Sequence, residues 1–283
     1  MQIGKFYIEQ LSEGFFELFP DGTLQKIEPD RLARGMDDPS LGKYSSAIGI
    51  DPLFISDGHL RIVVDPGLGW GLDHNSKYRD TSNVVTNLDI FDFKPEDIDI
   101  VILTHLHYDH AAGSTFVNEN YKTTVTFPNA VYLIQESEWN FAVQQSIADS
   151  GKMIGPGYLM DELYKLKAEK RLKLLNNGIH KVMNGFELIH TGGHTPGHQV
   201  VRLNSRGQSA YFLGDLVPTE HQLNNYSMKQ LDTDPLHSKK KKTTLLKEAL
   251  QSDAYMLFYH SLYQKSGKLS RDEHKKYVLL DVN

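Results

Sequence analysis

Apolar and polar positions along the chain alternate in a pattern that predicts two series of β-strands with helices between them. Short apolar runs rich in β-branched residues predict a first series of strands at about 46–55, 60–65, 98–104 and 130–134. A second series follows residue 180, with apolar runs at 186–190, 210–214 and 254–259. More polar stretches separate these runs. The pattern therefore predicts an α/β fold made of two similar halves.

Between the two halves, residues 136–175 are rich in helix formers. The pattern predicts one helix from Glu136 to about Ala148 and another from Asp161 to about Leu174, with glycines and a proline between them. This segment is expected to be a helical insertion. Two interpretations stay open for it, a wall of the substrate pocket or a connector packed on the outside of the fold.

A run of four lysines at 239–242 invites a model in which it binds nucleic acid or a membrane. The run leads into an amphipathic pattern that predicts a helix, opened by residues 231–235. The lysines are therefore expected to form the solvated face of that helix.

Composition favours a soluble enzyme built as one domain over residues 1–283. A chain of 283 residues with 40% hydrophobic content can bury a sizeable core. The net charge of −6 gives no basic footprint, so nucleic acid is not an expected partner. The chain has no cysteine, which excludes disulfides, a thiolate nucleophile and cysteine metal ligands. The composition does not indicate an oligomeric state.

The chain shows no sign of export or of membrane insertion. Residues 1–10 lack the apolar core and the small-residue cleavage site of a signal peptide. No apolar run approaches the roughly 20 residues needed to cross a bilayer. We therefore expect a cytoplasmic protein with no membrane partner.

The densest cluster of candidate chemistry directly follows the apolar run 98–104. His105 and His107 lie two residues apart at a strand end, so their side chains point the same way and can share one metal ion. Asp109 and His110 follow where a helix can begin, aimed at a point beside that metal. Taken alone, this motif could also be a solvated polar loop.

Three further strand ends carry side chains of the same kind. His194 follows the run 186–190 after a short glycine-containing loop, Asp215 follows the run 210–214, and His260 follows the run 254–259. One shared edge of the fold explains why imidazoles and carboxylates recur at strand ends. These donors predict a metal site held by nitrogen and oxygen ligands.

With these motifs, residues 45–262 resemble the metallo-β-lactamase superfamily of metal-dependent hydrolases. The resemblance implies a four-layer αββα sandwich with two divalent metal ions at one edge. It assigns the first ion to His105, His107 and His194, and the second to Asp109, His110 and His260, with Asp215 bridging. Zinc is the expected metal, although such donors also accept manganese, iron or cobalt.

The same resemblance assigns supporting roles to two residues. The stretch 63–69 is similar to the family's strand, aspartate and glycine turn, so Asp65 is expected to accept the outer N–H of a ligating histidine. His198, in the GHTPGH stretch at 193–198, is expected to support the site without binding metal. The remaining histidines have no partner in the pattern and are expected in the core or on the surface: His59, His74, His180, His190, His237 and His274.

The resemblance implies a hydrolase that uses a metal-bridging hydroxide on a small ester, lactone or phosphoester. Asp109 and Asp215 would orient the hydroxide, and Asp109 is also a candidate to pass a proton to the leaving group. The stretches 104–113 and 214–223 resemble acyl-homoserine lactonases and methyl-parathion-type hydrolases. Pro218 stands where many of those lactonases have a tyrosine that holds the substrate carbonyl. His221 and Tyr226 are candidates to replace that donor.

Three alternatives to this function stay open. A glyoxalase-II-like thioesterase shares the metal motif and the GHTPGH stretch. An iron-dependent oxygenase or oxygen reductase uses the same cradle, but flavin-linked di-iron relatives usually carry glutamate at the position of His107. A binding protein could keep the metals without turnover. The sequence leaves the substrate and the native metal open.

Overall fold

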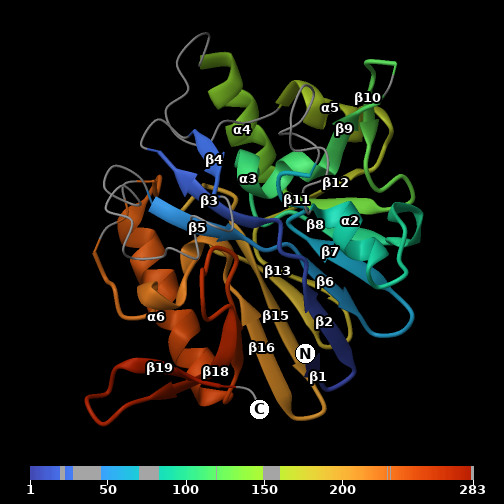
Figure 1. Cartoon of the computed structure of the whole chain (residues 1–283). Coiled ribbons are helices and arrows are strands. Elements are labelled where there is room, and N and C mark those ends of the chain that lie inside the picture. Colours follow the sequence, from blue (N-terminus) through green and yellow to red (C-terminus); the bar gives the residue numbers. More distant parts are fainter. Residues whose placement is uncertain are drawn as a thin grey trace.

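Two seven-stranded sheets form the centre of the molecule (Figure 1). The computed structural model describes residues 1–19, 23–27, 46–69, 83–118, 120–148, 160–227, 229 and 231–281. The first sheet contains, in spatial order, β1 (Gln2–Ile3), β2 (Phe6–Gln10), β6 (Leu53–Ser56), β7 (Arg61–Val64), β8 (Ile100–Ile102), β11 (Val131–Gln135) and β12 (Leu172–Leu175). The second contains β13 (Ile179–Met183), β14 (Phe186–His190), β15 (Gln199–Ser205), β16 (Gln208–Phe212), β17 (Tyr255–Leu257), β18 (Ser266–Arg271) and β19 (Tyr277–Leu280).

Smaller elements complete the fold. A three-stranded sheet is formed by β4 (Leu24–Lys26), β3 (Gly14–Leu18) and β5 (Ser46–Ile50), and a two-stranded one by β9 (Thr115–Val117) and β10 (Thr123–Val125). The helices are α2 (Val84–Asp89), α3 (Tyr108–Ala111), α4 (Glu136–Ala148), α5 (Met160–Ala168) and α6 (Pro235–Gln251), with short 3₁₀ turns at Pro95–Asp97, Ala112–Ser114, Gly214–Leu216 and Glu220–Gln222.

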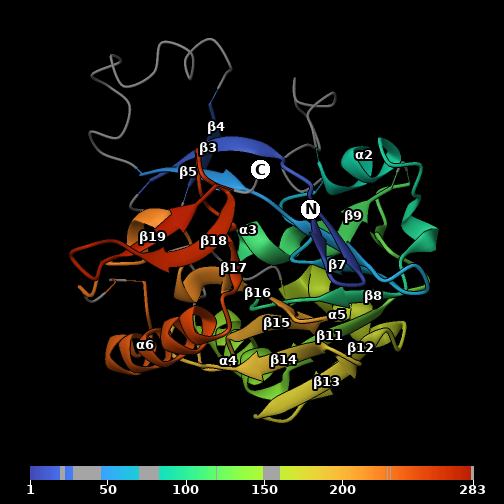
Figure 2. The same cartoon turned by 90° about the horizontal axis from the view of Figure 1, so that it is seen from below.

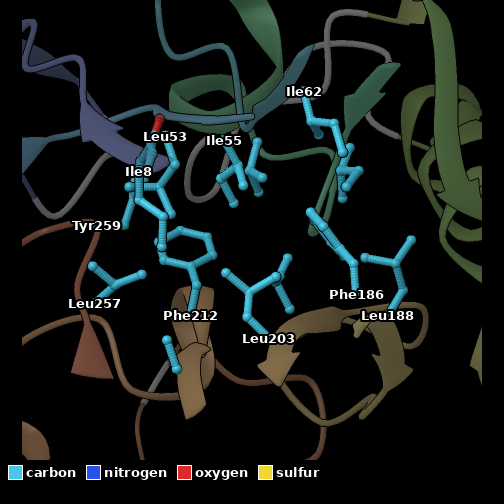
Figure 3. Close-up of a cluster of buried hydrophobic side chains, with 14 of the residues drawn as sticks. Ile8, Leu53, Ile55, Ile62, Phe186, Leu188, Leu203, Phe212, Leu257 and Tyr259 are labelled. Atoms are coloured by element: carbon cyan, nitrogen blue, oxygen red, sulfur yellow. The ribbon is translucent and has the colours of Figure 1, made fainter. Parts of the chain in front are cut away.

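The two large sheets pack face to face through an apolar core. Figure 3 shows Ile8, Leu53 and Ile55 of the first sheet facing Leu203 and Phe212 of the second. These side chains are almost fully buried. Each buried side chain of this size contributes about 1.5–3 kcal/mol to folding. The inner layers of the sandwich are therefore held together mainly by burial of aliphatic and aromatic surface.

Helices cover the outer face of each sheet. Leu88 of α2, Trp139 of α4 and Leu163 of α5 pack with residues of the first sheet in one buried cluster. Leu245 and Leu246 of α6 pack with residues of the second sheet in another. Figure 2 shows α2 and α6 on opposite sides of the strands. This four-layer αββα arrangement is the fold expected from the sequence.

The sequence pattern predicts one strand at about 46–55, where the structure has two. The structure divides this run into β5 in the small sheet and β6 in the first large sheet. Asp51 and Pro52 separate them. Proline lacks the N–H that a continuous ladder needs and restricts the residue before it, so the chain changes sheets there.

The second helix expected between the halves is shorter than its pattern indicated. The first matches α4, but α5 ends at Ala168, and β12 then pairs in parallel with β11. Lys170 takes a positive φ of 57°, which stops the helix. The prediction of helix to Leu174 was therefore wrong, because this short apolar run completes the sheet.

The lysine run lies on α6 as expected. Asp234 caps the helix by accepting from the His237 amide, and Pro235 stands at its first turn. One lysine departs from the solvated face. Lys242 is buried, and its ammonium donates to the carbonyls of Gln222 and Asn225. Burial lowers the pKa of Lys242 to about 8.

Candidate metal centre

The seven predicted ligands come together where strands of both sheets end. The structure gathers them into two groups, and the potential ligand atoms within each group lie within 4.8 Å of one another. The first ligand group is His105, His107, His194 and Asp215, and the second ligand group is Asp109, His110 and His260. All but Asp215 are buried. No other such group occurs in the part of the chain that the structure describes.

The first half of the site follows β8, at the carboxyl end of parallel strands. β8 ends at Ile102, and His105 and His107 lie in the extended segment before α3. Asp109 and His110 belong to the short helix α3, which His107 precedes as N-cap residue. Because the chain changes from extended to helical at His107, the side chains before and after this point face different directions. The motif at 105–110 therefore contributes to both ligand groups.

The other half comes from the second sheet. His194 lies in the loop between β14 and β15, Asp215 follows β16, and His260 follows β17. β16 and β17 are parallel neighbours, so their ends bring Asp215 and His260 together across 45 residues of sequence (260 minus 215). The helix α6 lies within this crossover, as parallel strands require.

Asp215 faces both ligand groups. Its Oδ1 lies 3.3 Å from Nε2 of His110 and 3.3 Å from Nε2 of His260. Its Oδ2 lies 3.3 Å from Nε2 of His194. One carboxylate therefore presents one oxygen to each group.

The outer nitrogens of four histidines are fixed by hydrogen bonds. His110 Nδ1 donates to Asp65 Oδ2 at 2.9 Å, which is the role expected for Asp65. His194 Nδ1 donates to Asp232 Oδ1 at 2.9 Å, and His260 Nδ1 donates to the Gly49 carbonyl at 2.8 Å. These acceptors place the proton on Nδ1 and direct the Nε2 lone pair inward.

His105 completes this arrangement through Thr104. The Thr104 hydroxyl donates to Asp65 Oδ2 at 2.7 Å, so it accepts from Nδ1 of His105 at 3.0 Å. The carboxylate of Asp65 thus orients one histidine of each ligand group. Asp65 is fully buried and also accepts from the Thr104 amide.

The inward nitrogens crowd one another. His105 Nε2 lies 3.0 Å from His107 Nδ1, which lies 3.1 Å from His194 Nε2. In the second group, Nε2 of His110 lies 3.2 Å from Nε2 of His260. Lone pairs at these distances repel unless a cation or a proton lies between them. Asp109 Oδ1 is buried and has no hydrogen-bond partner among the described residues. The donor set fits two divalent cations.

The charge balance of the site points the same way. Burial opposes a charge on His110, but the carboxylates of Asp109, Asp215 and Asp65 raise its pKa well above the usual range. The pKa of His260 is also raised against burial by Asp215 and Asp109. Burial and neighbouring histidines lower the pKa of His105 and His107. The carboxylates therefore attract positive charge, while His105 and His107 stay neutral, as metal ligands must.

His198 lies beside His105 but outside both ligand groups, which agrees with the supporting role expected for it. It is buried, its Nδ1 lies 2.7 Å from Thr191 Oγ1, and its ring centroid is 5.4 Å from that of His105. It belongs to neither ligand group. The other described histidines also lie outside both groups, and His74 lies outside the described residues.

His221 and Tyr226, the two candidates to replace a tyrosine donor, lie in the connection between β16 and α6. The side chain of His221 is 81% exposed and lies near Glu220. Tyr226 is 37% exposed and lies below the ammonium of Lys242. Pro218 itself contributes a backbone carbonyl that accepts from the amide of His260. The loop after Asp215 thus supports a ligand through its backbone.

Sequence reasoning missed several supporting residues. The sequence pattern places Asp232 only at a helix start, yet its carboxylate accepts from His194 and forms an ion pair with Lys229. Gly49 acts through its carbonyl, which has no sequence signature. Glu138 is fully buried, and its carboxylate accepts from the amides of Leu106 and Gly197 in the loops that carry the histidines. Asp232 and Glu138 have polar or charged neighbours in the sequence, so nothing in the pattern separates them from exposed carboxylates.

Comparison with known proteins agrees with this geometry. A family model described as the metallo-beta-lactamase superfamily matches residues 50–261. An N-acyl homoserine lactonase from a Bacillus species is 26% identical over 194 residues, which cover 68% of this chain and 67% of the relative.

Solved structures show the same fold. A probable metal-dependent hydrolase from Staphylococcus aureus superposes with a TM-score of 0.76 and 24% identity over all of both chains. A protein described as AidC, a dizinc quorum-quenching lactonase, has a TM-score of 0.74 and 20% identity, covering 100% of this chain and 97% of its own. None of the described helices of the present chain is long and apolar enough to cross a membrane.

The family match covers every predicted ligand, from His105 to His260, and the relatives confirm the expected enzyme class of metal-dependent hydrolases. On its motifs, its four-layer fold and this match, the chain belongs to the metallo-beta-lactamase superfamily.

Proposed function

We propose that the protein is a dinuclear metal-dependent hydrolase of a small ester, lactone or phosphoester. The observation that carries the proposal is the position of Asp215, whose two oxygens face the two ligand groups. A carboxylate in that position can bridge two cations. His105, His107 and His194 would hold the first ion, Asp109, His110 and His260 the second, and Asp215 would contact both.

Two bound divalent cations supply a water of lowered pKa and an electrophilic centre for the substrate oxygen. The chain's own residues provide the rest. The outer hydrogen bonds of His110, His194 and His260 hold the donors in place, so little reorganisation is needed when a substrate binds. Asp109 Oδ1, buried and without a hydrogen-bond partner among the described residues, is an available acceptor for the proton of an attacking water.

Lactones come first among the candidate substrates, and zinc first among the metals. The relatives matched in sequence are named N-acyl homoserine lactonases, and one structural neighbour is described as a dizinc lactonase. Because Pro218 has no hydroxyl, this chain would need a carbonyl contact other than a tyrosine at that position. Aryl esters, thioesters and phosphodiesters therefore belong in the same assay.

The test is a substrate panel with the metal content measured on the same sample. Protein loaded with zinc should hydrolyse at least one class in the panel, and Asp109→Asn should lower its kcat by about a hundredfold or more. Asp89→Asn, on the exposed face of α2, is the matched control and should leave the rate unchanged. Oxygen uptake without hydrolysis, or full activity of Asp109→Asn, would contradict the proposal.

A further inference from the structure

The carboxylate of Glu138 joins two loops that lie far apart in the sequence. Glu138 belongs to the first turn of α4 and is fully buried. Its Oε1 accepts from the Leu106 amide at 3.0 Å, and its Oε2 accepts from the Gly197 amide at 3.1 Å. Each oxygen of the carboxylate is thus committed to a different loop.

These loops carry the three histidines of the first ligand group. Leu106 lies between His105 and His107 in sequence, so its amide belongs to the segment that presents both rings. Gly197 lies three residues after His194, in the same loop. A shift of either loop relative to Glu138 would change the distance of 3.1 Å between Nδ1 of His107 and Nε2 of His194, which joins the two loops. Glu138 contacts no residue of the second ligand group in the hydrogen bonds described.

The local structure is built around this contact. Gly197 packs so closely that a Cβ at this position would overlap the backbone nitrogen of Glu138. Burial raises the pKa of the Glu138 carboxyl to about 7, against the opposing effect of its hydrogen-bond donors. An apolar side chain would fill the same space without this electrostatic cost. A buried carboxylate at this position is therefore better explained by its hydrogen bonds to the two loops than by packing.

We propose that Glu138 is a positioning residue that sets the spacing of His105 and His107 against His194 in the first ligand group. The inference rests on the proposed function, because it assigns that group to a metal ion. It also gives α4 a defined place in the site, since the first turn of the segment between the halves supports the ligand loops directly.

The matched pair of variants is Glu138→Gln and Glu136→Gln. Glutamine keeps the shape of Glu138 but has one acceptor oxygen, so its amide group must face one of the two backbone N–H groups. Glu136 lies two residues away in the same helical turn and is exposed. Three properties are compared with wild type: zinc affinity by titration against a competing chelator, the absorption spectrum of the cobalt-loaded protein, and amide hydrogen exchange of the metal-free protein.

In Glu138→Gln we expect one of the two zinc ions to bind about tenfold more weakly, with the other unchanged. The cobalt spectrum should change, and the amide of Leu106 or Gly197 should exchange faster even without metal. Glu136→Gln should behave as wild type. Two unchanged zinc affinities in folded Glu138→Gln, or an equal loss at both ions, would overturn the inference. A wild-type protein that binds no zinc would instead refute the proposed function, and this inference with it.

Discussion

Nδ1 of His107 lies 3.1 Å from Nε2 of His194, although the two residues come from different sheets. Their rings stand nearly perpendicular, at 89°. A cation bound here would convert a repulsion into a bond between the two halves of the sandwich.

Metal removal should therefore lower the stability of the fold. An ion that binds only the folded chain adds about 2.7 kcal/mol per site when its free concentration is 100 times Kd. In a chain of this size the apparent Tm should rise by roughly 2–4 °C for each kcal/mol. Thermal unfolding in excess zinc and in chelator measures the difference. An identical Tm in both conditions would contradict two ions bound by folded protein only.

Removing the carboxylate of Asp232 should weaken metal binding through His194. Asp232→Ala leaves Nδ1 of His194 without its acceptor, so the ring loses its fixed tautomer, and zinc affinity should fall by about 10- to 100-fold. Asp232→Asn keeps one acceptor oxygen, so its zinc affinity should lie between those of the wild type and Asp232→Ala. Asp253→Asn, whose side chain is 73% exposed, is the control. Chelator-competition titration measures all three, and equal affinities would show that the Asp232 contact is incidental.

Zinc affinity should decrease as the pH falls. In the metal-free protein the surrounding carboxylates raise the pKa of His110 and His260, although burial opposes the charge. Zinc must displace these protons, so binding releases them, and acid competes with the metal. Calorimetry in buffers of different ionisation enthalpy counts the released protons. Binding at neutral pH without proton release would contradict the raised pKa values.

Stability of the metal-free chain should fall between about pH 5 and pH 8 because of Glu13. Burial raises the pKa of Glu13 from 4.5 to about 8, although the amides of Leu68, Gly69 and Val84 donate to it. The folded state thus binds this proton more tightly than the unfolded chain does. Its contribution is complete below pH 4.5 and is lost as the pH rises through 8, by roughly 3–5 kcal/mol.

Denaturant unfolding at several pH values measures this loss. Glu13→Gln cannot ionise, so its free energy of unfolding should depend less on pH over the same range. Glu96→Gln, on an exposed site, should follow the wild type. Parallel pH profiles for wild type and Glu13→Gln would show that the folded and unfolded states bind the Glu13 proton equally tightly, which would contradict the raised pKa.

The sequence predicted which seven side chains gather at one edge of the fold, because the signal of each is local. A histidine or aspartate directly after an apolar run marks a strand end, and strand ends share an edge of the sheet. The supporting contacts are not local. Asp232 lies 38 residues from His194, and Gly49 lies 211 residues from His260, so only the folded chain brings them together. Backbone acceptors such as the carbonyl of Gly49 leave no trace in the residue types.

The errors in the fold have a similar origin. The run at 172–175, Leu-Lys-Leu-Leu, has no periodicity that separates the end of a helix from a short strand. The run forms a strand because it pairs in parallel with β11. The local sequence pattern cannot identify this pairing partner. Lys242 belongs to a lysine run that is otherwise half-buried or exposed, and only the carbonyls of Gln222 and Asn225 explain its burial.

The ligands of the second group are spread so widely that a bound ion would act as a clip. His110 and His260 are 150 residues apart, yet their Nε2 atoms lie 3.2 Å from each other. In a chain without cysteine, an ion held by both would close a loop that no disulfide can close. Loss of the metal would then release the tether between the chain's early and late segments, and partial proteolysis of the chelated protein would reveal that release.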